Sequence, residues 1–353
     1  MINSIDVKAL EDKFYSQEFK LSYSGLNKLM YSPRLFYQWY VLQEREEKIE
    51  SYLIDGKVIH CMLLDNGSFD KQFIISPSKL PTDNTRLVVD KIFDYYSKFT
   101  PVIEPDGSAA ILSPYLEDHS TKILEILLGL NLHQSLKTDE QRIAKIITDE
   151  TKSYFNFLMQ KGNKNLLDEE TYKRCKDNVD IIKNNKAISE LMCLQKSDFE
   201  LLEVYNEQYI ETKDNYGNIE TGILYPFGLK GIVDNLVIDY GKKIIYINDL
   251  KTSSKTLNDF SESISYYKYS LQAAIYKKLV EEKFKKELVS NWHIVFNFVV
   301  IDKYQQVCIF EISQDTMSKW QTELEDALRE AAYHYIHRNY TSPYKFITGK
   351  VTI

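Results

Sequence analysis

Paired cysteines are missing from this chain of 353 residues, whose four cysteines are spread over positions 61, 175, 193 and 308. None belongs to a CxxC pair, so the sequence gives little support to a zinc ribbon or a disulfide framework. No stretch approaches the roughly 20 apolar residues that span a bilayer. The opening MINSIDVKALEDKF also lacks the basic-then-apolar plan of a signal peptide. We therefore expect a cytoplasmic protein without a membrane partner.

An excess of positive charge is also missing. The 44 Lys and Arg residues face 51 Asp and Glu residues, which gives a net charge of -7. Such a balance argues mildly against a protein that coats nucleic acid, because phosphate binding needs concentrated basic residues. It does not argue against an enzyme that passes nucleic acid along a site lined by carboxylates. No Walker A or GxGxxG motif occurs, so we expect no intrinsic NTPase or dinucleotide site.

The order of expected elements divides the chain into a mainly helical part and a part rich in strands. Apolar residues recur at helical spacing in four stretches before residue 196, at 21–43, 51–64, 85–99 and 120–194. After that point, strand-like runs joined by Gly and Asn turns predominate, including a tight hairpin at Tyr240-Gly241. A helix over 261–284, two further strands and a last helix over 315–338 follow. This order predicts an α/β or α+β fold with a helical N-terminal half.

Three polar residues in the strand region carry the chemical signal. In the run KKIIYINDLKT, Asp249 and Lys251 alternate onto one face, and Leu250 faces the other way. Asp234 lies in the preceding apolar run, GIVDNLVIDY, and hairpin pairing brings side chains of neighbouring strands together. Two carboxylates and a lysine buried in an apolar sheet are costly without a compensating cation.

A divalent metal ion would compensate this charge. Carboxylate oxygens suit Mg²⁺ or Mn²⁺, which keep waters and accept phosphate oxygens as further ligands. Lys251 beside the metal would position or deprotonate the attacking water and stabilise negative charge. The alternative is a solvated edge strand, because D-x-K alone is common in strands. The order of Asp234, turn, Asp249, Lys251 and helix favours the catalytic interpretation.

Side chains outside the hairpin extend this candidate site. Tyr269, Gln272 and Tyr276 share one face of the expected helix, and Gln272 lies among apolar residues, where an amide usually has a specific partner. His60 lies in the apolar helix VIHCMLL, one turn after Gly56. A lone histidine there is more often a core residue than a metal ligand, so its candidacy depends on the rest of the set.

Two other groups of side chains carry weaker signals. His334 and His337 have metal-ligand spacing on the last helix, but no acidic motif such as H-E-x-x-H accompanies them. The tyrosines Tyr266, Tyr267 and Tyr269 either stack on unpaired bases or pack in the core. The sequence leaves that choice open.

Four motifs in order, GKVIH, GIVD, DLK and QAAIY, resemble the PD-(D/E)XK nuclease superfamily. More narrowly, they are similar to its RecB-like branch and to RecE-type and lambda-type phage exonucleases, and YSGLNKLMYSPRLFY resembles the opening helix of such domains. The resemblance runs from about residue 22 to 276. It implies a restriction-endonuclease-like core, a central mixed sheet flanked by helices. We expect one nuclease domain over 1–353, with 20–195 mainly helical and 196–340 as the sheet core.

The resemblance also implies roles for matching residues. Lys251, Asp249 and Asp234 would be catalytic, and Gln272, Tyr276 and Tyr269 would support the site or contact DNA. The family often has a glutamate on an upstream strand facing the metal, for which Glu207 is the better candidate and Glu203 the fallback. The implied metal ligands are His60, Asp234, Asp249, the Leu250 carbonyl and Glu207.

The expected activity follows from the same resemblance. It is Mg²⁺- or Mn²⁺-dependent exonuclease action, 5′ to 3′, on double-stranded DNA ends in phage-type recombination. A homo-oligomeric ring, a single-strand annealing partner and the cytoplasm of a bacterial or phage-infected host cell are implied by analogy. An iron–sulfur cluster is not expected, because Ser32 stands where such members carry a cysteine. The alternatives are a RecB-like endonuclease or repair nuclease and a non-catalytic DNA-binding subunit.

Overall fold

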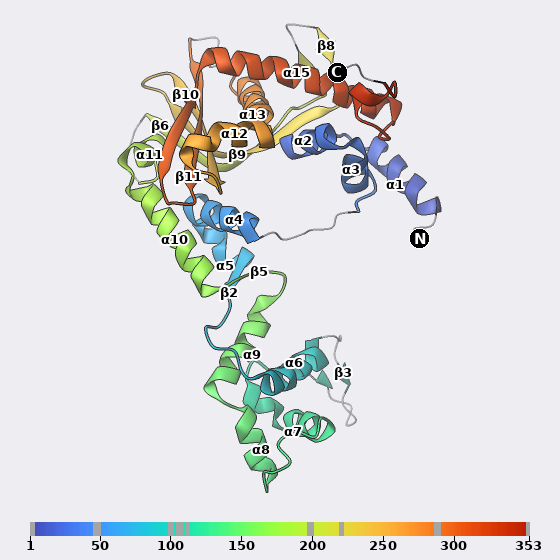
Figure 1. Cartoon of the computed structure of the whole chain (residues 1–353), viewed down its shortest axis with the longest axis vertical. Coiled ribbons are helices and arrows are strands. Elements are labelled where there is room, and N and C mark those ends of the chain that lie inside the picture. Colours follow the sequence, from blue (N-terminus) through green and yellow to red (C-terminus); the bar gives the residue numbers. More distant parts are fainter. Residues whose placement is uncertain are drawn as a thin grey trace. The chain divides into compact units, whose positions relative to one another are not determined.

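The computed structural model describes residues 4–44, 51–97, 102–103, 109–110, 113–195, 201–218, 222–285 and 291–350 (Figure 1). The chain divides into two compact units, one made of Met1–Asn66 with Asp177–Ile353 and the other of Gly67–Lys176. The second unit is therefore an insertion in the sequence of the first. Its limits do not coincide with the division at residue 195, where the sequence pattern changes from helical to strand-like. One nuclease domain over the whole chain stays a prediction.

A mixed six-stranded sheet forms the centre of the first unit. Its main path is β1-β9-β10-β11-β12, and β6 pairs with β9. The β9–β10, β6–β9 and β11–β12 pairs are antiparallel, whereas β10–β11 and β1–β9 are parallel. The predicted α/β class with a mixed central sheet is confirmed. The strands are β1 (Lys20–Leu21), β6 (Leu202–Glu211), β9 (Gly228–Asp239), β10 (Ile244–Ser253), β11 (His293–Asp302) and β12 (Val307–Ile312).

Helices pack on both faces of this sheet (Figure 1). Ile245 and Ile247 of β10 share one buried core with α13 and α15, and Asn248 points to the opposite face, where it donates to a carbonyl of α11. The unit also has a separate β7–β8 pair (Gly217–Asn218 and Ile223–Leu224). The helices are α1 (Ser4–Ser16), α2 (Tyr23–Tyr31), α3 (Pro33–Phe36), η1 (Tyr37–Val41), α4 (Ser51–Leu64), α10 (Glu169–Asn184), α11 (Lys186–Leu191), η4 (Leu257–Asp259), α12 (Phe260–Tyr267), α13 (Tyr269–Lys283), α15 (Gln314–His337) and η5 (Tyr344–Phe346).

The helix expected over 261–284 is wrong as one continuous element. Lys268 adopts a left-handed backbone conformation with φ of 54°, which ends α12 and starts α13 in a new direction. Tyr23 and Asn27 of α2 both donate to the Tyr267 carbonyl, at 2.6 and 3.2 Å. These tertiary bonds hold the break, which no glycine or proline in the sequence marks.

Local capping explains how the first unit begins. The Ser22 hydroxyl accepts the Gly25 amide and caps α2. Ser32 caps α3 in the same way, and Pro33 occupies the first turn of that helix, where its missing N–H costs nothing. The stretch 21–43, expected to be helical, therefore contains a break between α2 and α3 at Pro33.

The second unit, Gly67–Lys176, has its own apolar core. Buried Val88, Ile92, Ile123, Leu127 and Phe155 belong to one cluster contributed by α6, α7 and α9. The unit's limit at residue 176 falls within α10. Its elements are η2 (Asn66–Ser68), α5 (Phe69–Gln72), β2 (Phe73–Ile75), α6 (Asp83–Ser97), β3 (Val102–Ile103), β4 (Ala109–Ala110), η3 (Leu116–His119), α7 (Ser120–Gly129), α8 (Asp139–Ile146), α9 (Asp149–Lys161) and β5 (Asn165–Leu167).

In the described part of the chain, no helix has both the length and the apolar character needed to cross a membrane.

Candidate active site

The β9–β10 hairpin brings Asp234 beside Asp249 and Leu250. The antiparallel ladder runs from Asp239 opposite Ile244 to Asn235 opposite Asn248. Beyond this pair, a side chain replaces a backbone carbonyl as the acceptor. The Oδ2 atom of Asp234 accepts the hydrogen bond from the Leu250 amide at 2.7 Å. Asp234 is 7% exposed and Asp249 is fully buried. The end of the ladder therefore places two carboxylates side by side in an apolar sheet.

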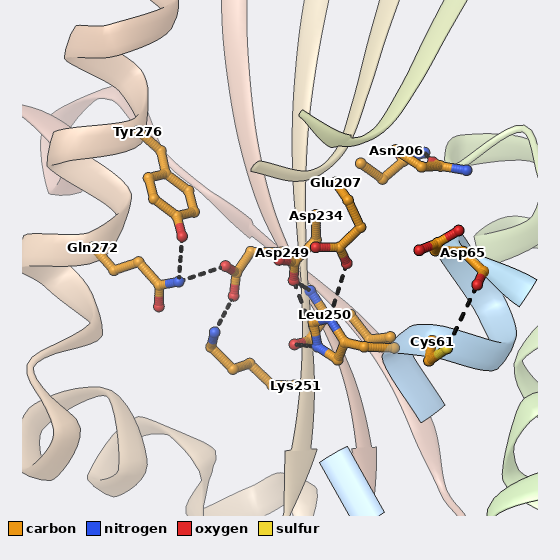
Figure 2. Close-up of polar contacts among 12 residues, drawn as sticks. Cys61, Asp65, Asn206, Glu207, Asp234, Asp249, Leu250, Lys251, Gln272 and Tyr276 are labelled. Carbon is orange, nitrogen blue, oxygen red and sulfur yellow. Dashed lines mark hydrogen bonds and ion pairs between the residues drawn. The ribbon is translucent and has the colours of Figure 1, made fainter. Parts of the chain in front are cut away.

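Lys251 and Asp249 form a buried ion pair, with 2.5 Å between Nζ and Oδ2. The other oxygen of Asp249 accepts the Gln272 amide at 2.8 Å, and the same amide donates to the Tyr276 hydroxyl at 3.1 Å (Figure 2). The Lys251 amine also lies 4.7 Å from the centre of the Tyr269 ring. The predicted alternation of Asp249 and Lys251 onto one face is confirmed, and Gln272 has the specific partner that its apolar surroundings indicated.

Charge around this pair favours a protonated lysine. Burial lowers the pKa of Lys251, but the carboxylates of Asp249 and Asp234 outweigh burial and raise it overall. Burial raises the pKa of Asp249 to about 6, although the Lys251 amine opposes the rise. Lys251 is therefore suited to offering positive charge rather than accepting a proton.

His60, Glu207 and Asp234 form a group of potential metal ligands. One ligand atom from each lies within 4.8 Å of the others. His60 Nδ1 is 3.5 Å from Glu207, and Nε2 is 3.6 Å from Asp234 and 2.9 Å from the Leu250 carbonyl oxygen. Metal–oxygen bonds are about 2.0–2.6 Å long, so two ligand atoms on one ion lie at separations like those measured here. Two carboxylates, a carbonyl and an imidazole therefore fit a divalent cation, with Asp249 adjacent.

The pKa of His60 reflects the negative charge of this donor group. Burial lowers the pKa of His60, but the carboxylates of Asp234 and Glu207 and the Leu250 carbonyl together raise it to about 9. The ring therefore carries a proton and a positive charge at neutral pH. A protonated imidazole has no free ring nitrogen for a cation, so a bound divalent ion would take the place of the His60 proton.

Glu207 reaches this group through an unusual backbone. Its φ is 48°, a left-handed conformation in the middle of β6. The flanking pairs, Asn206 with Asn235 and Gln208 with Val233, keep the regular register, so the distortion is confined to Glu207, opposite Asp234. A non-glycine residue in this region is strained and requires support from its surroundings. The fallback candidate Glu203 instead accepts the Tyr205 hydroxyl at 2.9 Å and is not in the ligand group.

Two glycines permit close approach of the helices that carry site residues. A Cβ added to Gly56 of α4 would lie 3.1 Å from the Thr252 hydroxyl on β10. A Cβ on Gly231 of β9 would lie 2.8 Å from the Tyr276 ring, closer than real Cβ contacts. The GKVIH and GIVD motifs therefore place α4 and α13 against the sheet.

A row of four asparagines, which the sequence did not reveal, crosses the sheet behind the carboxylates. We call Asn206, Asn235, Asn248 and Asn297 the asparagine ladder. Three of them donate an amide N–H along the row, at 2.8 Å from Asn235 to Asn206, 2.7 Å from Asn248 to Asn235 and 2.9 Å from Asn297 to Asn248, and Asn206 accepts at its end. Asn235 also donates to the Met192 carbonyl at 3.1 Å.

Three members of the asparagine ladder are sequence neighbours of Glu207, Asp234 and Asp249. Neighbours in a strand point to opposite faces, so the ladder fixes the strands from behind. The available signal was an amide beside each acid, in N-E, D-N and N-D pairs within strands.

The two histidines of the last helix differ in their surroundings. His334 is fully buried and its Nδ1 bonds to the Asn339 carbonyl at 2.5 Å, whereas His337 is exposed. The buried member, His334, already uses one ring nitrogen in a hydrogen bond within the fold.

Comparison with known proteins gives a family for the chain. No protein of curated function is matched by the sequence. A crystal structure of a candidate exonuclease from Eubacterium rectale matches all of this chain and 95% of its own chain, at 10% identity and a TM-score of 0.47. A likeness at this level bears on neither activity nor substrate. The model of the PD-(D/E)XK nuclease superfamily matches residues 20–342. That match covers the sheet and every residue of the site above, and the chain belongs to the PD-(D/E)XK nuclease superfamily.

Proposed function

We propose that this protein is a Mg²⁺-dependent exonuclease that hydrolyses phosphodiester bonds from the ends of linear double-stranded DNA. The observation that carries the proposal is the convergence of His60, Glu207 and Asp234, within 4.8 Å, beside the Lys251–Asp249 pair. This combination of oxygen-rich ligands and a buried lysine supplies both a cation site and a fixed positive charge. The 5′-to-3′ direction and a role in phage-type recombination come from the RecE-type resemblance.

His60, Glu207, Asp234 and the Leu250 carbonyl would hold the cation, with Asp249 next to them. The chemistry supplied by a bound divalent cation is a lowered water pKa and a polarised phosphate. Mg²⁺ is the expected ion, because oxygen donors and retained waters suit it, and Mn²⁺ is the expected substitute.

Lys251 would stabilise the negative charge that develops on the phosphate. Its amine is held by Asp249, which is held in turn by Gln272, so the charge is oriented before substrate arrives. Preorganised charge in a site with little water is worth more than the same charge in bulk solvent. The raised pKa of Lys251 favours this role over removal of a proton from water.

The decisive assay uses linear duplex DNA labelled at its 5′ or 3′ ends and covalently closed circular DNA, with Mg²⁺ or with EDTA. We expect Mg²⁺-dependent loss of linear DNA, release of label in the 5′-to-3′ order and intact circles. Cleavage of circles would instead identify an endonuclease of the same superfamily. Lys251→Ala is expected to abolish degradation, and Lys319→Ala, at an exposed position of α15, serves as the matched control. Unaltered degradation by Lys251→Ala would overturn the mechanism.

The resemblance further predicts a homo-oligomer and a single-strand annealing partner. Light scattering during size-exclusion chromatography measures the first directly. A monomer at working concentration would contradict a ring that encircles DNA.

A further inference from the structure

Two tyrosines at the C-terminal end of α12 lie exposed close to the site. Tyr266 is 78% exposed and Tyr267 is 40% exposed. Their rings meet edge to face, with 4.9 Å between centroids and 89° between planes. We call these two residues the tyrosine step. Large aromatic side chains at such exposure need a reason when they adjoin a functional site.

Ring contacts connect the tyrosine step to the catalytic lysine. The Tyr267 ring stacks on the Tyr269 ring at 5.4 Å and 23°, and Tyr269 has the Lys251 amine 4.7 Å from its centre. Two contacts therefore separate exposed Tyr267 from Lys251. Nucleotides of one DNA strand follow each other at about 3.4 Å along a duplex axis. The tyrosine step thus lies within a few nucleotides of a phosphate at Lys251.

The backbone below the tyrosine step is fixed. The Tyr267 carbonyl accepts bonds from the Tyr23 hydroxyl and the Asn27 amide of α2. The next residue, Lys268, is left-handed and exposed, and its amide bonds back to the Ile264 carbonyl. Aromatic rings on a fixed backbone lose little conformational entropy when a planar ligand stacks on them.

We infer that the tyrosine step is a stacking site for an unpaired nucleobase of the strand whose phosphate reaches Lys251. Every base offers a π face, so stacking on tyrosine binds single strands with little sequence preference. The exposed Lys268 adds positive charge beside the step for the strand's phosphates. A paired base in a blunt end presents no free face except at its terminus. The enzyme should therefore prefer a DNA end with a few unpaired nucleotides over a blunt end, an inference that rests on the proposed nuclease function.

Binding to a defined DNA end tests this inference. The probes are a blunt duplex and the same duplex with a four-nucleotide unpaired end that carries 2-aminopurine, in Ca²⁺ to hold cleavage back. Stacking on an aromatic ring should quench the fluorescence of 2-aminopurine. The wild type should bind the unpaired end more tightly than the blunt end. Tyr266→Ser and Tyr267→Leu should weaken that binding roughly 5- to 150-fold, the range that base–aromatic stacking supplies.

Two matched variants separate stacking from folding. Tyr267→Phe keeps the ring and should retain quenching and affinity. Tyr304→Ser removes a tyrosine that is 62% exposed in the β11–β12 turn and should change neither. If Tyr267→Leu binds the unpaired end as tightly as the wild type, or if Tyr267→Phe loses as much affinity as Tyr267→Leu, base stacking is not the role of the step.

Mg²⁺-dependent cleavage by the wild type is measured in parallel on both probes. Absence of cleavage from both would refute the proposed nuclease function, whereas cleavage without a preference for the unpaired end would refute only the stacking site.

Discussion

Two buried carboxylates of the first unit differ in the groups that stabilise their negative charge. Glu325 of α15, 7% exposed, accepts the Tyr225 hydroxyl at 2.7 Å on one oxygen and the Tyr216 hydroxyl at 3.2 Å on the other. Asp249, fully buried, bonds to the charged Lys251 and to Gln272 next to a second carboxylate, Asp234.

The contrast separates a structural acid, Glu325, from the acid that we propose to be catalytic, Asp249. Burial raises the pKa of both tyrosines around Glu325, so they stay protonated and both carboxylate oxygens have neutral donors. Around Asp249, Gln272 Oε1 is buried without a hydrogen-bond partner among the described residues. Like charges are also crowded there. A carboxylate with neutral donors on both oxygens is a structural group, whereas one that is crowded by a second carboxylate and paired with a charged amine is the arrangement expected at a functional site.

The largest expected effect is on catalysis. Asp249→Asn removes the charge that holds Lys251, and we expect the cleavage rate to fall roughly 10²- to 10³-fold, as for loss of one preorganised electrostatic group. Single-turnover cleavage of end-labelled DNA measures the rate. Glu325→Gln is the matched control and should cleave at the wild-type rate per folded molecule. An equal loss in both variants would remove the distinction between the two acids.

Metal binding gives the second effect. A cation that binds only the folded state at 100 times its dissociation constant adds about 2.7 kcal/mol to the free energy of unfolding. Mn²⁺ should therefore raise the urea midpoint of the wild type and of Glu325→Gln, but not of Asp234→Asn. A shift that persists in Asp234→Asn would place the cation elsewhere.

Stability should respond most at the structural acid. Glu325→Leu leaves two tyrosine hydroxyls without their acceptor, at a cost of roughly 1–3 kcal/mol for each unsatisfied group. Combining it with Tyr216→Phe and Tyr225→Phe removes the orphaned hydroxyls and should recover part of the loss. Urea unfolding measures both variants. If the triple variant is less stable than Glu325→Leu alone, the hydroxyls are not paired mainly with Glu325.

The smallest effect should come from the asparagine ladder. Asn248→Leu should weaken Mn²⁺ binding by roughly tenfold, the lower end of the range for residues behind a metal site. Asn297→Leu is the matched comparison, because Asn297 has no ligand beside it in sequence. Titration calorimetry gives both affinities. Equal losses would assign the ladder a purely structural role.

The sequence predicted what depends on local patterns. Alternation in β10 put Asp249 and Lys251 on one face, and the hairpin signal after Asp239 correctly brought Asp234 beside them. Helical periodicity identified α4 with His60 and the helical content of the N-terminal half. These features depend on neighbours in sequence, so a single chain carries them.

Features that depend on distant contacts were missed. The left-handed residues Glu207 and Lys268 carry no turn signal, and tertiary bonds from α2 hold the break at Lys268. The asparagine ladder requires the register of four strands, which no local pattern gives. The limits of the insertion at Asn66 and Asp177 likewise depend on which helices share a core.

The asparagine ladder also has a consequence for the order in which the protein is synthesised and folds. Its first and last members, Asn206 and Asn297, lie far apart in the sequence. The last hydrogen bond of the ladder can therefore form only after β11 has been synthesised and has paired with β10. Pairing across such a span is slow relative to local helix formation. A nascent chain on the ribosome, still short of residue 297, would carry His60 and all three carboxylates yet lack this bracing. We therefore expect this bracing of the site to form late in folding, once β11 has paired with β10.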